Sequence, residues 1–358
     1  MALPHDLATP TLVVDLDILD RNLRTMADHA ATMGVALRPH AKTHKCVEVA
    51  RRQLRAGATG LTVATVAEAE IFAAAGFDDL FIAYPLWVDH AKGRRLRELA
   101  GTVSLTIGID SPDGARALAA QLGEDLDRVG VLVEVDSGQH RTGVPPEEAG
   151  TVADQARHAG LDVRGVFTFP GHSYSPGRPE AVATEEASAL EDAAGALRAA
   201  GIEPHVVSGG STPSARFTGG GALTEIRPGV YPFGDAQQVE LGTCTFDQVA
   251  LSALATVVSH AGGAVVLDAG SKALGADRPG WTTGFGRLLD HPDARVAALS
   301  EHHSTVTWAG SPLPELGEKV RVVPNHVCNA VNLADELVVA QDGHVVDQWP
   351  VDARGANS

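Results

Sequence analysis

The sequence predicts an α/β fold, a (β/α)8 TIM-like barrel followed by a smaller, mostly antiparallel β domain. From Asp15 to about Gly229, short apolar runs alternate with alanine-rich amphipathic stretches, and eight such runs can be counted. After about Leu241 the runs are short and strand-like, with Gly, Asp and Pro turns between them and little helical periodicity. An open doubly wound sheet is the competing fold, and a miscounted strand would favour it.

Each predicted barrel strand is a short apolar run that precedes a stretch with helical periodicity. Several of these stretches begin with a capping residue or a proline in the first turn, as at residues 111–113 and 145–147. The clearest helical stretches are residues 47–54, 67–75 and 179–200. The eight strands begin near Val35, Gly60, Asp79, Val103, Val129, Val163, His205 and Glu225.

The second part of the chain reads as strands separated by turns. The opening run, residues 11–15, adds a strand to this part, which puts both chain ends in the same domain. We expect a cofactor-binding barrel over residues 12–240 and a β domain over 241–358 together with 1–11. The strand-like runs of the β domain are residues 249–258, 263–268, 303–308, 319–323 and 336–341.

Composition excludes several classes of protein. The chain has 358 residues, and its formal net charge of -17 argues against a nucleic-acid partner. Its three cysteines are too few and too scattered for a disulfide framework, which predicts a reducing cytoplasm. No run approaches 18 apolar residues, and residues 1–6 show no secretory signal, so we expect no membrane partner.

Lys42 lies where the apolar run of residues 35–37 ends and a helix is predicted to begin. Barrels place reactive groups at the carboxyl ends of their strands. Neighbouring cations, with Arg38 as one candidate, would lower the pKa of this amine and make it nucleophilic. Such a lysine forms a Schiff base with a carbonyl, and pyridoxal 5'-phosphate (PLP) is the commonest cofactor held in this way. We therefore predict a PLP site at Lys42, with His40 among its cofactor-binding residues.

Two turns after the seventh and eighth predicted strands offer a cradle for the phosphate of PLP. The first, residues 208–214, has two glycines for close approach of the backbone and four hydroxyl groups, and the second contains Gly229 and Tyr231. Barrels commonly bind phosphate between these two loops, which favours a cradle over two ordinary glycine turns. The predicted cofactor-binding residues of the first turn are Ser208, Gly209, Gly210, Ser211 and Thr212.

Two further polar groups are candidates whose spacing alone leaves them open. Arg141 follows the fifth predicted strand, where it can donate to the phenolic oxygen of the cofactor or lie on the surface. His326 and Cys328 would face the same side of an extended segment, and a nitrogen with a thiolate suits zinc. Spacing alone favours a pair in the core. Residues 301–303 either approach this pair or are solvated surface.

Five segments together resemble the D-threonine aldolase and D-serine dehydratase family, whose members are fold-type III PLP enzymes related to alanine racemase through the barrel. The resemblance covers nearly the whole chain, and the segments occur in the order found in the family. They are RPHAKTHK (38–45), DSGQHR (136–141), RPGVY (227–231), DAGSKAL (268–274) and PNHVC (324–328).

The resemblance implies roles for the residues of the predicted cofactor site. Lys42 is then the Schiff-base lysine, and Arg141 meets the phenolic oxygen of PLP. Residues 208–212, with Gly229 and Tyr231, hold the phosphate.

The resemblance also implies a divalent metal held by His326 and Cys328 in the β domain. Zinc is the first expectation, with manganese or magnesium as alternatives, because the dehydratase branch pairs histidine with cysteine and the aldolases tend to pair histidine with aspartate. A homodimer is implied as well, in which the partner's β domain completes the site.

The chain departs from the family's pattern after the sixth predicted strand. Related enzymes often carry a histidine near Phe169 that packs on the cofactor ring, and this chain has none there. His172 lies close by and is either an acid or base in the pocket or a simple loop histidine.

The expected function is a PLP- and metal-dependent lyase acting on D-amino acids that carry a β-hydroxyl. The histidine–cysteine pair favours β-elimination of water, which yields a keto acid and ammonia; retro-aldol cleavage to glycine and an aldehyde is the alternative. Two alternatives belong to other functional classes. One is an amino-acid racemase, which needs a second base and no metal, and the other is a non-catalytic PLP-binding protein.

Overall fold

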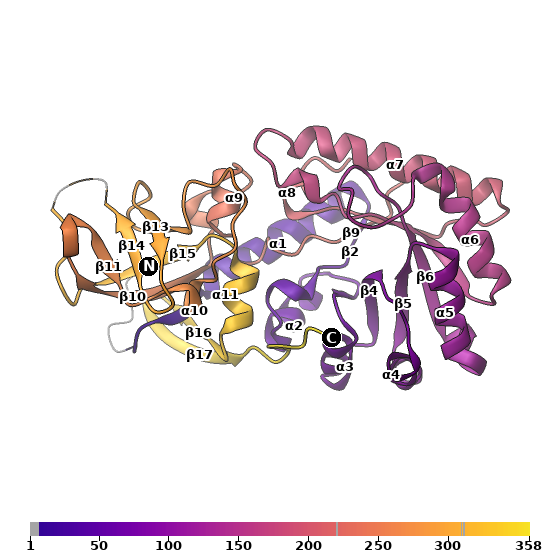
Figure 1. The fold of residues 1–358 in the computed structure, drawn as a ribbon, viewed down its shortest axis with the longest axis horizontal. Helices are drawn as coiled ribbons and strands as arrows, with labels where there is room; N and C mark the ends of the chain where they lie inside the picture. Colours follow the sequence, from indigo (N-terminus) through magenta and orange to yellow (C-terminus); the bar gives the residue numbers. More distant parts are fainter. Residues whose placement is uncertain (1–6, 220, 309, 311) are drawn as a thin grey trace. The chain divides into compact units, whose positions relative to one another are not determined.

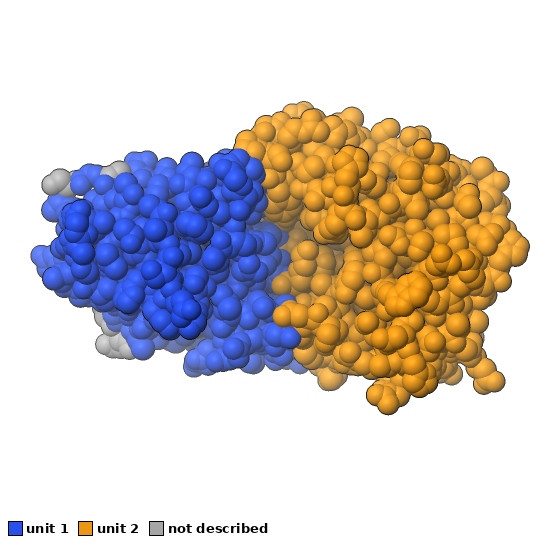
Figure 2. Space-filling model, viewed as in Figure 1, with its two compact units in different colours: residues 1–25, 43–52, 230–355 blue, residues 26–42, 53–229, 356–358 orange. Residues whose placement is uncertain are grey.

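The computed structural model describes residues 7–219, 221–308, 310 and 312–358. The expectation for residues 1–6 lies outside the described part. Two compact units make up the chain: unit 1 has residues 1–25, 43–52 and 230–355, and unit 2 has residues 26–42, 53–229 and 356–358 (Figure 2). Residues 12–25, 43–52 and 230–240 thus belong to the same unit as the C-terminal strands. The assignment of the cofactor to residues 12–240 and of the metal to 241–358 with 1–11 stays a prediction.

Unit 2 contains the predicted parallel barrel (Figure 1). Among the described residues, eight strands pair in the order β2-β9-β8-β7-β6-β5-β4-β3. A parallel bridge between His40 and Thr62 joins the two ends of this order, with Thr62 N donating to Pro39 O at 2.8 Å. The strands are β2 (Ala36–Leu37), β3 (Leu61–Val63), β4 (Asp79–Pro85), β5 (Ser104–Ile109), β6 (Val129–Glu134), β7 (Asp162–Phe167), β8 (Val206–Gly209) and β9 (Glu225–Ile226).

Helices alternate with these strands, and short-range capping explains several of their starts. The Ser111 side chain accepts from Gly114 N ahead of a first-turn proline, and Asp89 accepts from Lys92 N. In Figure 1, α4 to α7 run along the outside of the strands. α1 (Leu16–Met33) and α2 (Val47–Arg55) each begin in unit 1 and end in unit 2. The helices within unit 2 are α3 (Val66–Ala74), α4 (His90–Ala100), α5 (Pro112–Leu122), α6 (Ala149–His158), α7 (Pro179–Ala199) and α8 (Thr212–Ala215).

The barrel interior is filled by side chains. Every residue of β6 is buried, and Leu132 on it packs with Phe81 and Phe167. The two phenyl rings meet edge to face with centroids 5.1 Å apart, a favoured aromatic geometry. Burying a phenylalanine contributes about 2–3 kcal/mol, so this cluster stabilises the strands whose ends carry the candidate site.

Arg38, the residue after β2, is bound by two carboxylates. Its Nη2 lies 2.8 Å from Asp79 Oδ2, and its Nε lies 2.6 Å from Glu225 Oε2. Asp79 and Glu225 are the first residues of β4 and β9, at the amino ends of those strands. These two carboxylates compensate the charge of the guanidinium, and the effect of Arg38 on the Lys42 amine stays a prediction.

Unit 1 is built on a mostly antiparallel sheet. Six of its strands close on themselves in the order β11-β14-β13-β12-β15-β10, because β10 also pairs with β11. The predicted first strand is confirmed, since β1 pairs antiparallel with β10 and parallel with β16. The strands are β1 (Thr11–Asp15), β10 (Leu251–Ser259), β11 (Val265–Leu267), β12 (Gly286–Leu288), β13 (Arg295–Leu299), β14 (Ser304–Thr307), β15 (Lys319–Pro324), β16 (Glu336–Gln341) and β17 (His344–Pro350).

Three short helices complete unit 1. They are α9 (Ala236–Glu240), α10 (Ser271–Leu274) and α11 (Val327–Leu333). Of the helices in the described residues, none has both the length and the apolar character that crossing a bilayer requires.

Candidate active site

Lys42 lies in a short 3-10 turn (Ala41–Thr43) that follows β2, and it lines a cavity of about 330 Å³ in unit 2. This volume is typical of small-molecule sites. His40 and Arg141 line the same cavity, so three of the predicted cofactor-binding residues come together. The lining residues are His40, Lys42, Ala64, Ala83, Tyr84, Arg141 and Thr142.

Phe169, two residues past the end of β7, lies close to both cationic side chains of this cavity. The Lys42 Nζ is 5.3 Å from the centroid of its ring, and the Arg141 Cζ is 5.1 Å from the same centroid. Both distances are within the range of cation–π attraction. An aromatic face is therefore present beside the lysine at the position where related enzymes often have histidine.

Glu134, the last residue of β6, is a member of this site that sequence reasoning missed. It is buried, and the Thr142 hydroxyl donates to its Oε1 at 3.0 Å. Its Oε2 is buried without a hydrogen-bond partner among the described residues. Burial raises the pKa of Glu134 to about 7. The carboxyl group thus holds the turn that carries Arg141 from within the barrel.

The turn after β8 forms as predicted, but its hydroxyls are engaged within the protein. Ser211 caps α8: its Oγ accepts from Ser214 N while Ser214 Oγ accepts from Ser211 N. The buried Ser208 hydroxyl donates to Glu225 Oε1 at 2.7 Å and accepts from Arg227 Nε at 2.8 Å. Three of the hydroxyls offered for phosphate binding, those of Ser208, Ser211 and Ser214, are therefore hydrogen-bonded to neighbouring side chains or backbone.

The two glycines of this turn are required by close packing. A Cβ at Gly209 would lie 2.3 Å from the Glu186 carboxylate, and Gly210 has φ +80°. Gly210 N donates to Glu186 Oε1, and the Ser214 hydroxyl donates to Glu186 Oε2 at 3.3 Å. Glu186, on α7, was not predicted, and it holds this turn through the Gly210 N–H and the Ser214 hydroxyl. Residues 208–212 are not among those that line the Lys42 cavity.

Glu186 makes the stability of the turn depend on pH. Burial raises its pKa from the ordinary 4.5 to about 7, so the folded chain holds a proton that the unfolded chain has released. Folding stability from this group is full below pH 4.5 and is lost as pH rises to about 7, by up to about 3 kcal/mol. Glu186→Gln removes this loss, so the unfolding free energy of the variant should gain on that of the wild type between pH 5 and about 8 in urea titrations.

The exposed Glu191→Gln on the same helix serves as the control, for which the difference from wild type should stay flat with pH. The groups Glu134 and Asp235, whose pKa values burial also raises, are present in all three proteins and cancel in the differences. A flat difference for Glu186→Gln would contradict the assignment.

The His172 side chain is hydrogen-bonded to Glu185, a residue of α7. Its Nε2 lies 3.0 Å from Glu185 Oε2, and its Nδ1 is buried without a partner in the described residues. A Cβ at Gly138 would lie 3.0 Å from His172 Nε2, so the ring packs on the turn after β6. His172 is not among the residues lining the Lys42 cavity, and its acid or base role stays a prediction.

Gly229 ends unit 2, and the buried Tyr231 lies in unit 1. Pro228 O accepts a hydrogen bond from His40 N at 3.1 Å, which ties the turn after β9 to the segment that carries Lys42. The phosphate-binding roles of Gly229 and Tyr231 stay predictions.

The His326–Cys328 segment is not extended as predicted. His326 is the N-cap of α11, and Cys328 is the second residue of that helix. The side chains still interact, and the electrostatic interaction with Cys328, with Asp277 contributing, raises the pKa of His326 well above its usual range. The Cys328 thiol also donates to Thr43 Oγ1 at 3.3 Å, and Thr43 directly follows Lys42 in the chain.

An imidazole and a thiol are a fitting donor set for zinc. In the part of the chain that the structure describes, no group of three or more histidine, cysteine or acidic side chains is placed to hold a metal ion. Two donors leave coordination positions open, which is typical of catalytic rather than structural zinc sites. The residues present therefore fit an open metal site.

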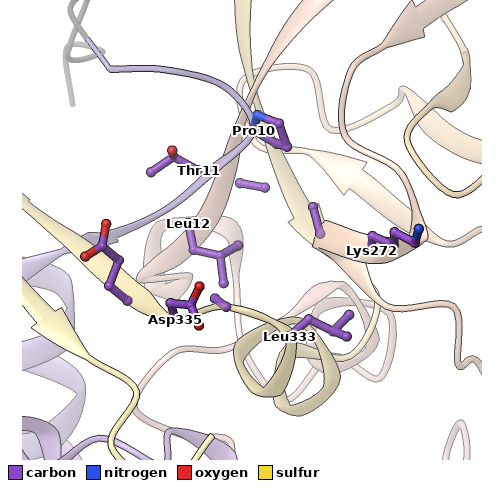
Figure 3. A pocket seen from close by; sticks show the side chains of 10 residues that line it. Pro10, Thr11, Leu12, Lys272, Leu333 and Asp335 are labelled. Carbon is purple, nitrogen blue, oxygen red and sulfur yellow. The ribbon is translucent and has the colours of Figure 1, made fainter.

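A second cavity, of about 300 Å³, lies in unit 1 (Figure 3). Leu12 and Leu333 form part of its lining, and two of its charged groups are engaged elsewhere: Lys272 pairs with Glu301 at 2.9 Å, and Asp335 pairs with Arg354. Glu301 and the two histidines after it are exposed. This cavity has no nucleophile with a neighbouring base, so the Lys42 cavity remains the candidate active site.

Comparison with known proteins shows which protein family this chain belongs to. The "Alanine racemase, N-terminal domain" model matches residues 14–237, and the "Putative serine dehydratase domain" model matches residues 250–340. D-threo-3-hydroxyaspartate dehydratase from Delftia sp. (strain HT23) is 36% identical over 95% of this chain and 96% of its own. D-threonine aldolase from Arthrobacter sp. is 37% identical over 97% and 93%. The chain belongs to the fold-type III PLP family of these enzymes.

Solved structures agree with the membership in this family. A cysteine-to-alanine variant of D-threo-3-hydroxyaspartate dehydratase, in the metal-free form, has a TM-score of 0.88 and 32% identity to this chain, covering 98% of it and 99% of the variant. The predicted barrel and β domain are confirmed by this likeness.

Proposed function

We propose that this chain is a PLP- and metal-dependent lyase that acts on D-3-hydroxy-α-amino acids, with β-elimination of water as its reaction. The observation that carries the proposal is the cavity in which Lys42 and Arg141 face one aromatic ring at the carboxyl ends of the barrel strands. Relatives named as dehydratase and aldolase of such amino acids support it.

In this proposal the Lys42 amine binds the aldehyde of PLP, and the bound cofactor supplies an electron sink for a bond broken at Cα. Arg141 donates to the phenolic oxygen, and Phe169 packs against the ring. His40 lines the cavity beside the lysine, and residues 208–212, with Gly229 and Tyr231, hold the phosphate. The hydroxyls of Ser208 and Ser211 and the backbone N–H groups of Gly210 and Ser211 already have partners within the protein, so in this proposal the phosphate takes the place of some of these partners.

His326 and Cys328 hold the metal, with zinc as its identity. When bound, zinc acts as a Lewis acid toward an oxygen. The hydrogen bond from Cys328 to Thr43 supports a functional link, because it places a ligand candidate beside the residue that follows Lys42. After proton removal at Cα by the Lys42 amine, loss of the β-hydroxyl gives elimination. Retro-aldol cleavage is the second candidate, since the Arthrobacter aldolase is 37% identical to this chain.

The remaining parts of the proposal are more specific than membership in the family. We propose a small D-amino acid as the only substrate class, a homodimer as the functional state and the cytoplasm as the location. No membrane or nucleic-acid partner enters the proposal, and the charge of -17 supports the latter exclusion.

The proposal is tested by the products formed from D-serine and D-threonine. PLP-loaded protein should release pyruvate from D-serine and 2-oxobutyrate from D-threonine, each with ammonia, and a chelator should suppress both. The L-enantiomers are the matched controls and should give no product. Glycine with acetaldehyde from D-threonine would instead indicate retro-aldol cleavage. Racemised substrate without keto acid, in a metal-independent reaction, would contradict the lyase assignment.

A further inference from the structure

We propose that Asp277 is a positioning residue that orients His326 for the metal, an inference that rests on the proposed metal site. Its Oδ2 lies 2.5 Å from His326 Nδ1, although the two residues are 49 positions apart in the chain. A carboxylate accepts hydrogen bonds and does not donate them, so Nδ1 carries the proton. Nε2 is then the nitrogen left for the metal, and its tautomer is set by Asp277.

The segment that carries Asp277 is built for close approach to α11. Gly275 has φ +72°, and a Cβ there would lie 2.9 Å from the Cβ of Asn329 on that helix. The Asp277 carbonyl accepts from Asn325 Nδ2 at 3.1 Å, and Asn325 is itself buried. The residue before His326 and the residue that contacts its ring are thus tied to each other directly.

A second acidic residue, Asp235, binds the backbone next to His326, and its contacts differ from those of Asp277. Asp235 is fully buried, and its carboxylate accepts from Val327 N at 3.1 Å and from Gln238 N at 2.8 Å. Asp235 therefore holds backbone, whereas Asp277 holds the imidazole ring. Asp235 acts on His326 through its charge, and Asp277 is hydrogen-bonded to the ring itself, so of the two it is Asp277 that can set the tautomer of the ligand nitrogen.

The competing reading is a plain ion pair at the protein surface. The side chains of His326 and Asp277 are about one-third and two-fifths exposed, and such a pair contributes little to stability. A plain ion pair would leave metal affinity unchanged when it is removed. A carboxylate that orients a ligand histidine raises metal affinity by about 10- to 100-fold.

The test measures zinc affinity of the PLP-loaded protein by competition with a chelator. Asp277→Ala should weaken zinc binding by about 10- to 100-fold. Asp277→Asn keeps an oxygen that accepts from Nδ1, so its affinity should lie between those of the alanine variant and the wild type. Asp293→Asn, an exposed acidic residue of the same unit, is the control and should bind zinc as the wild type does.

Two outcomes overturn the inference. Wild-type zinc affinity in Asp277→Ala shows that the contact is a surface ion pair. A changed absorption spectrum of the cobalt-loaded Asp277→Asn protein at saturation shows that the carboxylate binds metal itself and does not position the histidine. Failure of the proposed metal site is distinguishable from both, because then the wild-type protein binds no zinc.

Discussion

Replacing Lys42 with alanine should abolish both the yellow absorbance of the lysine–cofactor linkage and turnover of D-serine. The lysine amine is the only proposed covalent attachment and also the proposed base at Cα, so its loss removes two contributions at once. The expected fall in kcat is on the order of 10³-fold or more. Absorbance spectra of the purified protein with added PLP, together with a pyruvate assay, check both parts.

Lys42→Arg is the variant that separates covalent chemistry from charge. Arginine keeps a cation that can face the Phe169 ring, which lies 5.3 Å from the lysine Nζ, but it forms no imine at neutral pH. It should therefore be as inactive as Lys42→Ala and equally colourless. The exposed Lys92→Ala should behave as the wild type. Substantial activity in Lys42→Arg would mean that the amine contributes only its charge, and the proposed chemistry would fall.

The barrel was predictable because its strands are short apolar runs followed by helices that cap locally. Strand β6 is buried at all six residues, and its sequence reads as one uninterrupted apolar run up to Glu134. Strand β17 was missed for the opposite reason. It pairs only with β16 and is exposed at five of its first six positions, so its sequence carries no pattern of burial.

The residues of the candidate site also fall into two groups, those that the sequence predicts and those that it does not. Lys42 and His40 follow β2 and Arg141 follows β6, and a closed parallel barrel brings the carboxyl ends of all its strands to one rim. Asp277 and Glu186 act through contacts 49 and 24 residues distant, and no local pattern announces such pairs. A signal for Asp277 did exist, because it lies three residues past the DAGSKAL segment that resembles the family.

The prediction that His326 and Cys328 lie on one face of an extended segment is wrong in its local geometry, and their role as metal ligands stays a prediction. The segment was taken as extended, where alternate residues share a face. In the structure the chain turns from β15 into α11 between them, and the helix start carries the cysteine. Two residues of such a turn can lie together as well, so spacing does not distinguish the two geometries.

Among the three cysteines of the chain, we expect Cys328 to be the one that binds the metal. The other two are poor metal ligands, because burial raises the pKa of the Cys46 and Cys244 thiols to about 12. Cys328 is partly exposed and faces His326. Cys244→Ala is therefore the matched control for any change at Cys328, and it should keep zinc content and activity.

Replacing Cys328 with alanine should remove the zinc and lower kcat by about 100-fold, as loss of several kcal/mol of Lewis-acid stabilisation implies. Cys328→Asp changes the donor from sulfur to oxygen, and oxygen donors suit manganese and magnesium better than thiolate does. Manganese should therefore restore activity to the aspartate variant and not to the alanine variant. Elemental analysis and a metal-titrated pyruvate assay measure both effects. Full activity of zinc-free Cys328→Ala would show that the reaction needs no metal, and elimination would then rest on the barrel residues alone.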